Sequence, residues 1–106
     1  MNAAQIPTDY TEIMQIRSMK PRFFDDEILG NLPPLTRLLF IGLYFKADKE
    51  GRLADKPRSI KRELLGYDDV TAEQVDGMLE ELQTAGLIAR NQGEGFLQVV
   101  ELGGAK

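Results

Sequence analysis

The chain has 106 residues, of which 42% are hydrophobic and 28% charged, a composition typical of one soluble globular domain and unlike that of a disordered chain. It contains no Cys and no His, which excludes disulfides, thiolate or imidazole metal ligands, and nucleophiles or general bases of those types. The formal net charge of −4 argues against a general binder of polyanions.

The two ends of the chain carry no pattern of a packed element. We expect residues 1–10 to be disordered, residues 11–102 to form the domain, and residues 103–106 to be a loose tail. Within the domain, residues 11–17 are expected to be a short extended segment. The start lacks the basic and apolar regions of a signal peptide, and no apolar run approaches the roughly 20 residues of a membrane helix. These features predict a cytoplasmic protein that contacts no membrane.

The first half of the domain predicts two helices and a strand. Acidic residues at 25–27 favour a short helix over residues 26–30, with Phe23 and Phe24 anchoring it to the core. Pro33 and Pro34 then begin a long helix over residues 34–45 that is apolar nearly all round, except at Thr36 and its neighbour, and is therefore the central helix. A polar turn ending at Gly51 separates this helix from a small strand at 52–54.

The second half predicts two helices and a hairpin. A short basic helix over 57–65 has Asp55 as its N-cap and Pro57 in its first turn. Thr71 and Gln74 then form a capping box at the start of an amphipathic helix that Gly86 closes. The runs 87–90 and 96–100 are strand-like, and five residues with two Gly join them as a hairpin.

This order of elements predicts an α+β, mainly α fold: a winged helix-turn-helix. Its parts are a three-helix core, an extra short N-terminal helix, and a small antiparallel sheet whose β-hairpin is the wing. The alternative is another small α+β domain with a terminal hairpin. The residues expected to share the core are Leu38, Leu39, Ile41, Leu43, Ile60, Leu64, Val75, Leu79, Leu82, Ile88 and Phe96.

Several blocks of sequence also resemble a known family. The blocks IRSMKPRFF (16–24), LTRLLFIGL (35–43) and ADKEGR (47–52) are similar to the amino-terminal domain of phage- and prophage-encoded replication-initiation proteins. The likeness covers most of residues 17–100. It implies a winged helix that binds origin DNA or partner replication proteins, as replisome-organiser factors do. The polar and aromatic stretch that follows the wing in that family is absent here, so activities of a whole initiator are not implied.

Charge is segregated along the chain: eleven of the 13 basic residues lie within 17–62, whereas 63–86 holds seven acids and no base. Basic residues three and four apart on the short helix share one face, which suits phosphate contacts; a merely solvated face is the alternative. The candidate DNA-binding residues on that helix, the N-terminal arm and the wing are Arg58, Lys61, Arg62, Lys56, Arg17, Lys20, Arg22, Arg90, Asn91 and Gln92. The wing residues have the same alternative, that of a solvated turn.

The helix at the position of a recognition helix points Glu73, Asp76, Glu80 and Glu81 outward. Carboxylates repel phosphates, so this helix is expected to be a core element with a solvated acidic back rather than a reader of bases. The acids at 25–27 and 68–69 are interpreted as caps and turn residues. We expect no metal, cofactor, small-molecule substrate or catalytic centre, and hence no enzyme.

These expectations favour a DNA-binding module that contacts double-stranded DNA through basic residues outside the acidic helix. The alternative is a protein-interaction winged helix that docks on a replisome partner or on a second copy of itself. A continuous basic face would favour DNA, whereas basic residues interrupted by acids would favour a protein partner.

Overall fold

The structure, a computed structural model, describes residues 22–100. The predicted disordered segment 1–10, the extended segment 11–17 and the tail 103–106 lie outside the described residues. The elements in chain order are α2 (Arg22–Asp25), α3 (Glu27–Gly30), α4 (Pro34–Lys46), β1 (Arg52–Ala54), α5 (Pro57–Leu64), α6 (Ala72–Thr84), β2 (Ile88–Asn91) and β3 (Phe96–Val99). They form a compact α+β unit, about half helical, with a small antiparallel sheet.

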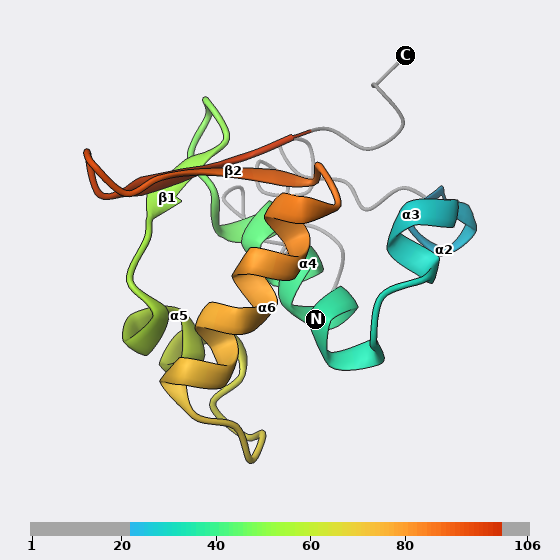
Figure 1. The fold of residues 1–106 in the computed structure, drawn as a ribbon, viewed down its shortest axis with the longest axis horizontal. Helices are drawn as coiled ribbons and strands as arrows, with labels where there is room; N and C mark the ends of the chain where they lie inside the picture. Colours follow the sequence, from blue (N-terminus) through green and yellow to red (C-terminus); the bar gives the residue numbers. More distant parts are fainter. Residues whose placement is uncertain (1–21, 101–106) are drawn as a thin grey trace, which may run out of the picture.

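The sheet has the order β1-β3-β2, so the last strand lies between the other two. Arg52 pairs with Gln98 across β1 and β3, and Ile88 pairs with Val99 across β2 and β3. Figure 1 shows α4 and α6 together on one side of this sheet, with no described helix on its other side. The sheet therefore has one face against the core and one face that the helices leave open.

The core fills the space between the helices and the inner sheet face. Leu39 and Leu43 of α4 and Leu79 of α6 are fully buried, as predicted from their helical spacing. The inner sheet positions add Ile88 and Leu97. The fully or largely buried apolar side chains are Phe23, Leu29, Leu39, Phe40, Leu43, Ala47, Ile60, Leu65, Val75, Leu79, Leu82, Leu87, Ile88 and Leu97.

Three predictions about the core are wrong. Leu38 is 48% exposed, because α4 buries one side rather than its whole circumference. Phe24 is 73% exposed, since the short helix α2 turns Phe23 inward and its neighbour outward. Leu97, not Phe96, is the core residue of β3, because successive side chains of a strand point to opposite faces.

Of the three predicted side-chain N-caps, two are confirmed. Thr71 accepts a hydrogen bond from the backbone N–H of Gln74 at 3.0 Å, and the Gln74 side chain accepts one from the Thr71 N–H at 2.8 Å, which completes the capping box of α6. Asp26 caps α3. The prediction that Asp55 caps α5 is wrong: Lys56 occupies that position without a side-chain bond, and the Asp55 carboxylate turns to Arg90.

Within residues 22–100, no helix combines the length and the apolar character needed to cross a bilayer.

Candidate functional site

The predicted basic helix exists as α5 and exposes its cations. Pro57 stands in its first turn, and buried Ile60 fixes the inward side, so the basic residues three and four positions apart lie on the outer side. Arg58 and Arg62 are exposed, and Lys61 is half-buried. Lys56, at the N-cap, is exposed as well. Figure 1 shows α5 at the same end of the molecule as the hairpin tip.

One carboxylate interrupts the basic surface of α5. Glu63 lies 3.3 Å from the Lys46 ammonium and 3.7 Å from the Arg62 guanidinium, and all three side chains are substantially exposed. Exposed pairs of this kind contribute about 0–1 kcal/mol and exchange readily with solvent or another anion. Among the described residues, no carboxylate pairs with Lys56, Arg58 or Lys61. The surface therefore keeps a net positive charge.

Arg90 has a role that the sequence reasoning missed. Its side chain is only 2% exposed, and its guanidinium binds three carboxylates: Asp55 at 2.7 Å, Asp76 at 2.7 Å and Glu80 at 2.9 Å. The hydrogen bond with Asp55 is the main reason that the pKa of Arg90 is raised above its ordinary value, while burial acts in the opposite direction. Arg90 thus joins β2 to the start of α5 and to α6, and it is not exposed for a phosphate contact.

The contacts of Arg90 also change the interpretation of α6, the predicted acidic helix. Asp76 and Glu80 are half-exposed but bind Arg90, and Glu81 accepts a hydrogen bond from the hydroxyl of Thr36 at 2.9 Å. Thr36 is 1% exposed, so the polar interruption expected on the surface of α4 is a buried contact to α6. Of the four predicted outward acids, Glu73 alone has no such contact within the described residues. Three of the four acids of α6 therefore have structural partners.

The wing candidates Asn91 and Gln92 are exposed at the hairpin tip. The side-chain oxygen of Asn91 accepts a hydrogen bond from the Glu94 N–H at 3.2 Å, and Gly95 closes the turn with a φ of 80°. Asn91 thus stabilises the turn, and Gln92 is the exposed polar group at the tip. The arm candidates Arg17 and Lys20 lie outside the described residues, and Arg22 is the first residue of α2.

A further cation, Arg52 on β1, was not among the predicted site residues. Its guanidinium carbon lies 4.7 Å from the ring centroid of Phe96, and its Nε donates to Gln98 Oε1 at 3.2 Å. Both partners belong to β3, more than 40 residues later in the chain. The alternation of side chains along a strand assigns each of them to one face of the sheet. Only the β1–β3 register, however, brings Arg52, Phe96 and Gln98 together.

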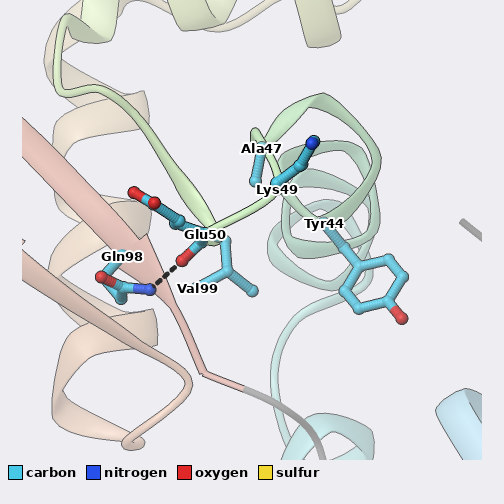
Figure 2. Close-up of a pocket in the computed structure, with 7 residues that line it drawn as sticks. Tyr44, Ala47, Lys49, Glu50, Gln98 and Val99 are labelled. Carbon is cyan, nitrogen blue, oxygen red and sulfur yellow. Dashed lines mark hydrogen bonds between the residues drawn. The ribbon is translucent and has the colours of Figure 1, made fainter. Parts of the chain in front are cut away.

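Figure 2 shows a separate hollow of about 270 Å³ between the end of α4, the turn before β1, and β3. Its lining residues are Tyr44, Ala47, Lys49, Glu50, Gly51, Gln98 and Val99. The Gln98 amide points to the Glu50 carbonyl and donates to it. Across residues 22–100 there is no group of three or more carboxylates close enough to hold a metal ion.

No protein-family model matches the chain, and comparisons with curated proteins and with solved structures give no match either.

Proposed function

We propose that this chain is a DNA-binding winged-helix module of a phage-type replication initiator, and that it contacts double-stranded DNA through the outer face of α5. The winged-helix reading is supported by the sequence of helices followed by a hairpin whose last strand pairs with β1. Lys and Arg on one helix face suit a row of phosphates. The exposed, largely unpaired cations of α5 are the single observation that carries the proposal.

The contact surface is smaller than the sequence suggested. Arg58, Arg62 and Lys56 are its main donors, Lys61 contributes from a half-buried position, and Gln92 supplies the polar tip of the wing. Arg90 is left out because three carboxylates already bind its guanidinium. Its role is internal: it holds the wing strand against the helices that flank the contact surface.

The test is the binding of purified protein to a labelled duplex at several salt concentrations, followed by fluorescence anisotropy. Each lost phosphate contact lowers the slope of log affinity against log salt by about 0.9. Arg58→Ala should show that reduction, whereas Lys49→Ala removes the same charge from the turn before β1 and should leave the slope unchanged. Equal effects of the two variants would mean that only total charge matters, and an unchanged affinity in Arg58→Ala/Lys61→Ala/Arg62→Ala would refute the proposal.

A second candidate function is protein association through the outer face of α4. Leu38 and Phe45 are 48% and 38% exposed, and their spacing of seven residues puts them on one side of the helix. Exposed apolar side chains on a common face are typical of protein contacts. Leu38→Ser/Phe45→Ser should then abolish association measured by sedimentation without changing duplex binding. Loss of duplex binding with association intact would count against this candidate.

A further inference from the structure

The outer face of the sheet carries a distinct set of side chains. The residues at its alternate positions are Arg52 and Ala54 on β1, Phe96 and Gln98 on β3, and Ala89 and Asn91 on β2. Four of the six are exposed, and Phe96 and Gln98 in the central strand are half-buried. No described helix covers this face (Figure 1). The face therefore combines one aromatic ring, one cation and small or amide neighbours, with no carboxylate at these six positions.

Arg52, on the edge strand β1, is held against side chains of the central strand β3. Its guanidinium lies over the Phe96 ring at 4.7 Å, and its Nε is bound to Gln98. Gln98 is in turn fixed by its donation to the Glu50 carbonyl. Because the guanidinium is already ordered on the ring, a ligand that stacks on it pays less conformational entropy than it would with a free arginine.

The neighbours of this pair leave room for a flat ligand. On β1, Ala54 is directly opposite Phe96, and on β2, Ala89 is directly opposite Gln98, so methyl groups lie beside the stacked pair at these two positions. Asn91 of β2, the other residue opposite Phe96, carries a short amide. A phosphate would need no more than an accessible cation. A planar heteroaromatic ring, in contrast, needs an uncovered flat surface, and aromatic and guanidinium planes are the surfaces on which unpaired bases stack.

We propose that the outer face of the sheet binds single-stranded DNA, with an unpaired base stacked on the Arg52–Phe96 pair. The two terminal nitrogens of Arg52 have no acceptor among the described residues, so they donate to the phosphate next to that base. The guanidinium contacts the negatively charged backbone of the strand, and the stacked Arg52–Phe96 pair contacts the base. This site is distinct from the α5 surface proposed for duplex DNA, and neither depends on the other.

The experiment measures the full chain against three labelled probes by anisotropy: a 12-nucleotide dT strand, the same strand with abasic spacers in place of its central bases, and a duplex. Wild-type protein should bind the dT strand more tightly than the abasic strand. Arg52→Ala should weaken dT binding about tenfold, which corresponds to one lost stacking contact. It should weaken abasic binding less, because the abasic strand loses only the phosphate contact, and it should leave duplex binding unchanged. Arg62→Ala is the matched control, since it removes an exposed arginine from α5 and should weaken duplex binding alone.

Phe96→Leu tests the ring itself, because it keeps an apolar side chain of similar size and removes the π surface. It should weaken dT binding several-fold. When 2-aminopurine replaces a central base of the dT strand, the quenching of its fluorescence by the protein should decrease in parallel. Thermal unfolding confirms that both variants are folded. The proposal is overturned if wild-type protein does not bind the dT strand, if it binds the abasic strand equally well, or if Arg52→Ala binds dT as wild type does. An effect of Arg52→Ala on duplex binding alone would assign the residue to the duplex contact instead.

Discussion

Arg90 offers the sharpest test of how the domain is held together. Arg90→Met keeps most of the apolar length of the side chain but removes the guanidinium that binds Asp55, Asp76 and Glu80. The last two carboxylates are about half-exposed and regain water, whereas Asp55 is 2% exposed and is left as a buried charge without a partner. Breaking a buried pair in this way costs about 3–5 kcal/mol. With one fully buried partner we expect the lower end, about 3 kcal/mol.

Urea unfolding followed by circular dichroism measures this loss directly. A loss of about 3 kcal/mol is a large share of the roughly 5–15 kcal/mol that stabilises a domain and lowers the melting temperature by roughly 12–24 °C. Arg37→Met is the matched control, because Arg37 donates to one backbone oxygen, that of Leu32, and should cost about 1 kcal/mol.

The pH dependence of the stability lost in Arg90→Met follows from the direction in which the pKa of Arg90 is shifted. Because the pKa of Arg90 is raised in the folded state, its contribution is fully present below the unfolded pKa and is lost only as the pH rises through the folded value. The difference between wild type and Arg90→Met should therefore stay constant from pH 7 to 10. Adding Asp55→Asn should recover part of the stability by removing the buried charge. If Arg90→Met and Arg37→Met cost the same, or if Asp55→Asn deepens the loss, the reasoning is wrong.

Three further predictions concern the helices, each measured by the free energy of unfolding. Leu79→Ala should cost about 2–5 kcal/mol, because the side chain is fully buried in the core of α6; a loss below 1 kcal/mol would contradict the packing. Thr71→Ala should cost about 1 kcal/mol by removing the cap of α6, whereas Thr84→Ala, at the exposed end of the same helix, should have little effect. Gly66→Ala should cost about 1–3 kcal/mol, because its new Cβ would lie 2.8 Å from the backbone oxygen of Arg62, and an unchanged midpoint would show that this turn can relax.

The sequence was sufficient for the features that depend on local periodicity and capping. The capping box at Thr71, the cap at Asp26 and the hairpin with its Gly95 turn follow from residues within a few positions of each other, and the structure has all three. Burial was predicted well wherever helical spacing was clear, as for Leu79. It failed for Phe96, because a short strand gives two possible phases, and only its partners select one.

Contacts between segments that lie far apart in the chain could not be predicted from the sequence. Asp55 is of a residue type that often caps helices and stands just before α5. Its carboxylate, however, binds the guanidinium of Arg90, 35 residues later in the chain. Arg90 was predicted to contact DNA because of its position at the wing, yet the pairing of the hairpin turns this residue inward between α6 and Asp55. Arg52 was overlooked because its neighbours in sequence contain no aromatic residue, and its ring partner comes from β3.

The placement of β1 beside β3 has a consequence for the order of folding. Arg52 and Gln98 are 46 residues apart, and α5, α6 and β2 all lie between them in the chain. Closing so long a loop is entropically costly until the intervening helices have packed, so β1 should join the sheet late. A partly folded chain would then already display the cations of α5, while the Arg52–Phe96 pair would be absent. The outer sheet face would mark the completed fold, and its ligand would select fully folded molecules.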